Sequence, residues 1–247
     1  MLRREANGCF NFADKPAFRP NLSPEEVLRA GAFGGGYFRD ITSTVTSESY
    51  VDAWRELPKD WIKGLDVKTR LASQVYRKEV NKYGVDCGGK AGKDDAFGLK
   101  AWETAGWMRP QDPYGWFQWY CRFFAGRRTD DDDRQISRWV KCAGDRGRWR
   151  SNLVAKCLRD GRAFDDRTVS PVVRQTLLHW AYDLTLADFE AAAARVKING
   201  ATYVPRSSLA RVMRPPQEEE EEEEKEEEEE EETTTTSRKK KRRRRTT

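Results

Sequence analysis

The chain has 247 residues, of which 46 are Lys or Arg and 41 are Asp or Glu, so its formal net charge is +5. This length allows one or two domains. The sequence contains no apolar run long enough to cross a bilayer, and it therefore excludes a helical membrane protein.

The charges are distributed unevenly along the chain. Residues 217–247 contain fourteen Glu and nine basic residues, which gives this tail a net charge of −5 and leaves the preceding residues with +10. The glutamates fill 218–224 and 226–232, and eight consecutive basic residues fill 238–245. Because so polar a segment cannot bury enough apolar surface to fold, we expect residues 206–247 to be a disordered tail.

The five cysteines are an odd number, far apart, and no two have Cys-x-x-Cys spacing. They are Cys9, Cys87, Cys121, Cys142 and Cys157. This pattern predicts free thiols and no structural zinc. The first residues lack a secretory signal, so a reducing compartment is expected. Nothing in the sequence indicates a metal or a cofactor.

The first part of the chain predicts an arm followed by a short helix. Aromatic residues alternate with prolines and charges over residues 1–19, which is typical of an extended arm on the surface. Ser-Pro-Glu-Glu at residues 23–26 is a helix start with a cap, a proline and an acidic first turn. Three glycines at 34–36 could present backbone amides to an anion, but their spacing matches no phosphate-binding loop and favours a structural turn.

Weaker local patterns occupy the middle of the chain. The β-branched residues of 41–46 permit a brief strand, and the apolar spacing in 50–57 predicts a helix that ends before Pro58. Residues 88–93 superficially resemble a phosphate-binding loop but lack the following Ser or Thr. Residues 97–107 predict another short helix.

Residues 112–128 carry more aromatic surface than any other stretch of this length. Asp112 and Pro113 suit the N-terminus of a helix, as cap and first helical residue. Apolar side chains then cover most of the helix circumference, so this helix should lie buried at the centre of the fold. The remaining narrow side of this helix carries small and polar residues, among them Gln118 and Arg122. This mixture suits either close helix packing or a polar site.

Two basic helices are predicted next. Four aspartates at 130–133 suit the first turn of a helix better than a cation site, because consecutive acids point in different directions. After a tight turn, residues 146–159 predict a second helix, and the pair has a helix-turn-helix outline. The basic residues here are a candidate phosphate-binding face: Arg127, Arg128, Arg134, Arg138, Lys141, Arg146, Arg148 and Arg150. The alternative is a solvated face paired with the neighbouring acids.

The only histidine, His179, lies on a largely apolar helix that begins at residues 170–171. If this helix packs against the aromatic helix, a polar pocket would form from Gln118, Arg122, Arg174, Gln175 and His179. Arg122 or Arg174 could bind an anionic substrate there, with His179 as a catalytic acid or base. The alternative for His179 is a hydrogen-bonded packing role.

The end of the globular part carries two strong local signals. Residues 185–188 have the pattern of a capping box, and Asn199-Gly200 predicts a two-residue hairpin turn. We therefore predict a mainly α fold: a single compact helical domain over 20–205 around the aromatic helix, a small C-terminal β-hairpin and a charged tail.

Several long motifs are shared with other proteins. They occupy residues 31–35, 37–39, 61–66, 81–84, 87–88, 112–128, 134–139, 147–150 and 170–180. Through them, most of all through the Asp-Pro-Tyr-Gly-Trp-Phe-Gln-Trp-Tyr-Cys-Arg-Phe-Phe and Gly-Arg-Arg runs of 112–128, the chain resembles a family of uncharacterised proteins of algae, plants, fungi and large DNA viruses. The likeness covers roughly residues 20–185. The chain departs from the family pattern at Asp40, where the relatives have proline, and near 88–97. The resemblance implies a shared fold and assigns no reaction.

Three function classes remain open from the sequence. The first is a nucleic-acid-binding protein (DNA or RNA) that uses the basic helical face, with nearby aromatics to stack on unpaired bases. The second is an enzyme acting on an anionic or nucleic-acid substrate at the polar pocket. The third is a non-catalytic protein-interaction module. The basic run 238–245 fits an import-receptor signal and predicts a nuclear location, with the cytoplasm as the alternative.

Overall fold

The computed structural model describes residues 4–87, 98–195, 197–198 and 201–202, all within one compact unit that spans 1–205. The charged tail at 206–247, with its import signal, and the phosphate-loop-like run at 88–93 lie outside the described residues. No helix in the described part of the chain combines the length and apolar character that a bilayer crossing needs.

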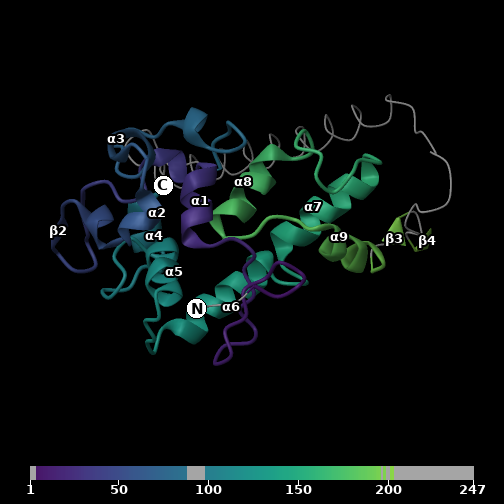
Figure 1. The fold of residues 1–247 in the computed structure, drawn as a ribbon, viewed down its shortest axis with the longest axis horizontal. Helices are drawn as coiled ribbons and strands as arrows, with labels where there is room; N and C mark the ends of the chain where they lie inside the picture. The colour runs from purple at the N-terminus through teal and green to yellow at the C-terminus, as the bar shows by residue number, and fades with distance from the viewer. Residues whose placement is uncertain (1–3, 88–97, 196, 199–200, 203–247) are drawn as a thin grey trace, which may run out of the picture. The chain divides into compact units, whose positions relative to one another are not determined.

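The described part is mainly α-helical, as predicted, with two short antiparallel strand pairs (Figure 1). The helices are α1 (Pro24–Ala30), α2 (Lys59–Ile62), α3 (Val67–Arg70), α4 (Leu99–Thr104), α5 (Trp116–Phe124), α6 (Asp132–Ala143), α7 (Arg148–Arg159), α8 (Pro171–His179) and α9 (Leu186–Ala193). The strands are β1 (Ile41–Thr42), β2 (Ser49–Tyr50), β3 (Lys197–Ile198) and β4 (Ala201–Thr202). Short 3-10 turns occur at Phe33–Gly35, Ala53–Glu56 and Lys78–Val80.

The aromatic helix α5 lies in the core, and the rings of Phe117, Trp119, Tyr120 and Phe123 have no exposed surface. It begins at Trp116, three residues later than the Pro113 expected from the sequence. The reason is that Asp112 does not cap the helix, because its carboxylate binds two arginines instead.

The N-terminal segment is part of the core, contrary to the expected surface arm. Phe18 is fully buried, and its ring contacts those of Trp116 and Trp119 from α5 and of Trp139 from α6. Phe12 is 2% exposed and packs against Phe123. Aromatic side chains of this size are stabilised most by full burial, which explains why the segment folds inward.

The capping and hairpin patterns, whose interacting residues are close in the chain, are present in the structure. Ser23 and Glu26 form the complete capping box of α1, and the Thr185 side chain accepts from the Asp188 amide at the start of α9. Strands β3 and β4 pair antiparallel, with Lys197 opposite Thr202, so a hairpin is present as predicted, while the turn residues Asn199 and Gly200 lie outside the described residues. The prediction of a helix over 50–57 was wrong: β2 pairs with β1, and a 3-10 turn at Ala53–Glu56 follows.

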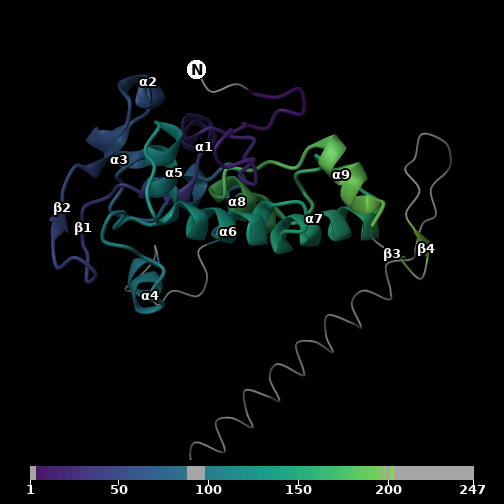
Figure 2. The ribbon, with the colours of Figure 1, turned by 90° about the horizontal axis from the view of Figure 1, so that it is seen from below.

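Helices α6 and α7 follow one another after a tight turn, and α7 packs against α8 and α9 as well as α6 (Figures 1 and 2). Buried residues of α7 include Leu153, Val154 and Cys157. The basic residues of α6 and α7 are therefore carried by helices that pack against other helices of the fold.

Candidate nucleic-acid interface

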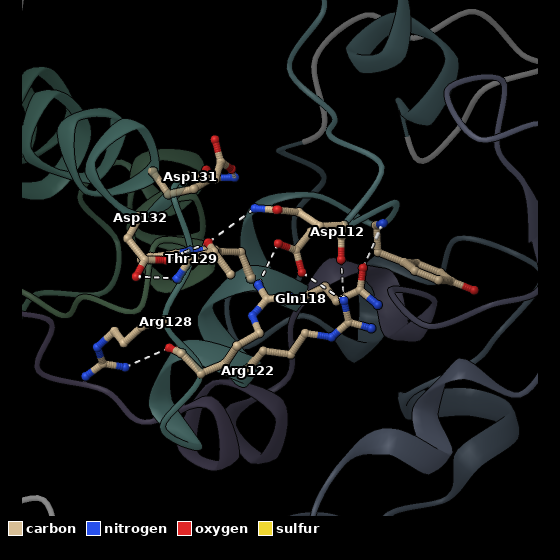
Figure 3. Close-up of polar contacts among 12 residues, drawn as sticks. Asp112, Gln118, Arg122, Arg128, Thr129, Asp131 and Asp132 are labelled. Atoms are coloured by element: carbon tan, nitrogen blue, oxygen red, sulfur yellow. Dashed lines mark hydrogen bonds and ion pairs between the residues drawn. The ribbon is translucent and has the colours of Figure 1, made fainter.

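Gln118 and Arg122 from α5 belong to a charged cluster around Asp112 (Figure 3). The Asp112 side chain has no exposed surface and accepts from Arg122 Nη1 at 3.0 Å and Arg127 Nη2 at 2.6 Å. Arg122 also binds Glu56 at 2.5 Å, and Gln118 Nε2 donates to the other oxygen of the same carboxylate at 3.0 Å. Gln118 and Arg122 are therefore both engaged by side chains of the fold itself.

Two aspartates at the start of α6 are also engaged internally. Asp132 is buried and accepts from the indole Nε1 of Trp119 at 2.8 Å. It also accepts from the amide of Thr129 at 3.0 Å (Figure 3). Asp131 binds Arg134 through two bonds, of 2.5 and 2.7 Å. The interpretation of these acids as structural groups holds for both residues, although Asp131 pairs with a side chain instead of capping the helix.

Half of the predicted phosphate-binding face is neutralised by carboxylates. Besides Arg127 and Arg134, this applies to Arg128, which binds Asp14 at 2.5 Å and lies over the ring of Phe123. It also applies to Arg150, which is 4% exposed and binds Asp188 at 2.8 Å. Each of these four guanidinium groups is engaged by a carboxylate, although Arg128 itself lies at the surface.

Gln175 and His179 form a separate network on α8. The amide of Phe33 donates to His179 Nε2 at 2.9 Å, and the Gln175 side chain bonds the amide of Tyr83 and the carbonyl of Gly31. The glycine turn that follows Phe33 is closed in the same way, since the Gly34 amide donates to Asn81 Oδ1 at 2.8 Å. The turn thus presents no free amide from these residues to an anion.

His179 lies beside a cysteine, and no sequence pattern indicates this pairing. Cys87 Sγ lies 3.3 Å from His179 Nδ1. Because Nε2 accepts the Phe33 amide, the neutral ring carries its proton on Nδ1, towards the sulfur. Burial lowers the pKa of His179 to about 3 and raises the pKa of Cys87 to about 12. Both groups are neutral at pH 7, which favours packing over catalysis.

Arg174 belongs to neither network. It is 3% exposed, and its guanidinium donates to the carbonyls of Val169 at 2.9 Å and Phe164 at 2.8 Å. It therefore braces the loop that precedes α8. The hydrogen bonds of the five residues predicted to form one polar pocket are distributed over three sets of contacts.

Four cations of the predicted face have no carboxylate partner among the described residues. They are Arg138, Lys141, Arg146 and Arg148. The last three are exposed, and Arg138 is half-buried. Two of the four lie over indole rings: Arg138 over Trp107 and Trp180, at 5.7 and 5.6 Å from the ring centroids, and Arg148 over Trp149, at 4.9 Å. The sequence carried no signal for these ring contacts.

The comparisons with known proteins identify no relative. No family model, no curated protein and no solved structure matches this chain. Within the ranges that the structure describes, no group of three or more His, Cys, Asp or Glu side chains could hold a metal ion.

Proposed function

We propose that this protein binds nucleic acid through a smaller surface than the sequence predicts, here called the cationic surface. It consists of Arg138, Lys141, Arg146 and Arg148. The observation that supports it is the division of the predicted face: four arginines are ion-paired, and these four cations keep no carboxylate partner among the described residues. An unpaired guanidinium or ammonium group on a rigid helix is a ready partner for phosphate oxygens.

Two residues of the cationic surface, Arg138 and Arg148, come from the two sides of the turn between α6 and α7. Arg138 and Lys141 are three residues apart and lie on one side of α6. Both Arg138 and Arg148 lie near the Cys142 thiol at the end of α6, so these two arginines are close to one another. The first turn of α7 has no acidic residue and no side-chain cap. Its amides therefore add positive potential beside Arg148.

The other two function classes have less support. The enzyme hypothesis required Gln118 and His179 to share a pocket, and each has different partners. An interaction module is the outcome that remains if no nucleic acid binds. We propose a nuclear location on the sequence of residues 238–245, and a shared fold with the uncharacterised family that the chain resembles.

The test is a binding titration of the full chain with labelled single-stranded and duplex oligonucleotides at several salt concentrations. The variant R138Q/R148Q removes two charges from the cationic surface. The matched control, K156Q/R159Q, removes two charges from the far end of α7, where neither residue has a carboxylate partner within the described ranges. For a single strand, the slope of log K against log salt should become less negative by about 1.4 in R138Q/R148Q, and should not change in the control.

A third protein separates the tail from the body. In this full-length variant the basic residues of 238–245 are replaced by Gln. We expect it to retain binding that is sensitive to R138Q/R148Q. Binding that is lost with the tail charges and is indifferent to R138Q/R148Q would assign nucleic acid to the tail and remove the function from the body.

A further inference from the structure

Trp107 is an exposed aromatic side chain held in a fixed place. Its side chain is 49% exposed, and among the large apolar residues that the structure describes as exposed it is the only aromatic one. Its amide donates to the carbonyl of Trp102 at 3.0 Å, and its own carbonyl accepts from Arg134 Nη1 at 3.3 Å. These two bonds fix the backbone of Trp107 at the surface, where its indole is presented to solvent.

Arg138 lies between this ring and the core. Its guanidinium lies over both Trp107 and Trp180, and Nη1 donates to Gln135 Oε1 at 2.9 Å. Trp180 in turn packs on Trp116 of α5, with ring centroids 4.6 Å apart. Arg138 and Trp180 therefore connect the exposed ring of Trp107 to the central aromatic helix.

Arg138 has no carboxylate hydrogen-bond partner among the described residues, although the charge of Asp131 acts on it from nearby. Burial lowers the pKa of its guanidinium, and the nearby positive charge of Arg134 acts in the same direction. A partly desolvated cation with only a neutral amide as its hydrogen-bond partner is stabilised when an anion arrives. The arginine one turn earlier in α6, Arg134, already has Asp131 and gains less from a new anion.

We infer that Trp107 and Arg138 form a stacking site for an unpaired nucleobase, in which the indole takes the base and the guanidinium takes an adjoining phosphate. This inference rests on the proposed function and narrows its ligand to single-stranded DNA or RNA. Bases in a duplex are stacked on one another and paired, so their faces cannot reach an indole, whereas an unpaired base has a free face.

The experiment measures binding of the full chain to four labelled probes of equal length. They are oligo(dT), oligo(U), an abasic strand with the same phosphates, and a duplex. Loss of one base stack corresponds to about 1–3 kcal/mol, or about 5- to 150-fold in affinity. We expect W107A to weaken binding of the two strands that carry bases by at least about fivefold. Its affinity for the abasic strand and the duplex should remain unchanged.

Two further variants separate stacking from structure. W107F keeps an aromatic face and should recover most of the lost affinity, whereas V172A, which trims another exposed apolar side chain on α8, should bind all probes as the wild type does. Equal weakening of all four probes by W107A would show a structural role and overturn the inference. Unchanged oligo(dT) and oligo(U) binding in W107A would also overturn it, even if R138Q/R148Q still weakens binding and the proposed function stands. If neither W107A nor R138Q/R148Q weakened binding, both this inference and the proposed function would be overturned.

Discussion

The hydroxyl of Tyr37 donates to the backbone carbonyl of Tyr114 at 2.6 Å. The same oxygen accepts the amides of Phe117 at 2.9 Å and Gln118 at 3.2 Å. These are two of the free amides in the first turn of α5, whose cap position is Gly115 and offers no side chain. A tyrosine about 80 residues earlier in the chain thus takes the place of a capping side chain.

Removal of that hydroxyl should destabilise the protein more than an ordinary Tyr-to-Phe change. We expect Y37F to lower the free energy of unfolding by about 3 kcal/mol, because three buried backbone groups lose their partner. Chemical denaturation gives this value. The control is Y50F, whose hydroxyl bonds only Thr46 and Glu48 near the surface and should cost less than about 0.5 kcal/mol. Equal losses in the two variants would contradict the capping role.

The neutral state of His179 predicts a specific dependence of stability on pH. The pKa is about 3 in the folded protein and about 6.5 in an unfolded chain, so only the unfolded chain binds the proton between these values. The stability contributed by the neutral ring is complete above about pH 6.5 and is lost as the pH falls towards 3.

Urea unfolding of the wild type and H179Q at pH values from about 7 to about 5 measures this effect. The difference in unfolding free energy between the two proteins should shrink, by up to about 1.4 kcal/mol for each pH unit. Glutamine does not titrate, and contributions from the other groups cancel in the difference. A difference that stays constant over this range would show that the folded ring titrates normally.

The Asp112 cluster predicts a large effect from a single lost charge. D112N leaves Arg122 and Arg127 facing a neutral group, and the loss of one partner of a buried ion pair costs about 3–5 kcal/mol. Since both arginines are partly exposed, we expect a value near about 3 kcal/mol in chemical denaturation. E56Q changes the outer carboxylate of the same cluster, and its cost should be about 1 kcal/mol or less. If E56Q lowered the free energy of unfolding more than D112N does, Glu56 and not Asp112 would be the main stabilising carboxylate of the cluster.

The burial of Phe18 predicts that the first twenty residues are required for stability. F18A removes a ring with no exposed surface and should lower the free energy of unfolding by about 3–5 kcal/mol. V51A, at a side chain that is 69% exposed, serves as the surface control and should be close to neutral. If F18A unfolds at the same denaturant concentration as the wild type, the segment is not part of the core.

Ion-paired and unpaired arginines should differ in binding. R128Q removes a charge that is already paired with Asp14, so it should leave affinity for single strands within about twofold. R148Q alone should make the salt slope less negative by about 0.7, because its charge has no carboxylate partner among the described residues. Titration of R128Q and R148Q with a labelled single strand at two salt concentrations measures both the affinity and its salt slope. An equal effect of the two substitutions would mean that Asp14 releases Arg128 when nucleic acid binds.

The sequence predicted those features whose partners are neighbours in the chain. The capping residues of α1 and α9 lie three positions apart, and each helix starts where its pattern indicates. Asp112 had the same local appearance, but its carboxylate binds Arg122 and Arg127, ten and fifteen residues away. Local sequence cannot decide between an amide and a guanidinium as the partner of a carboxylate.

The candidate site was predicted only in part for the same reason. The spacing of basic residues indicated a cationic face, but not which cations would meet acids. Arg128 meets Asp14 across 114 positions. His179 has its hydrogen-bond partners Phe33 and Cys87 at 146 and 92 positions. Such pairings are set by the assembled core, and the sequence alone gives no distance between these groups.

The N-terminal segment also determines when the protein can finish folding. Asn21 exchanges two hydrogen bonds with the backbone of Asp183, 162 positions later. The ring of Phe18 packs against the ring of Trp139. At ribosomal rates of about 5–20 residues per second, the first aromatic rings wait roughly 8–30 s for these partners to be synthesised. During that interval Phe12 and Phe18 are exposed on the nascent chain. We therefore expect chaperones that hold apolar segments to bind this end of the protein while it is still attached to the ribosome.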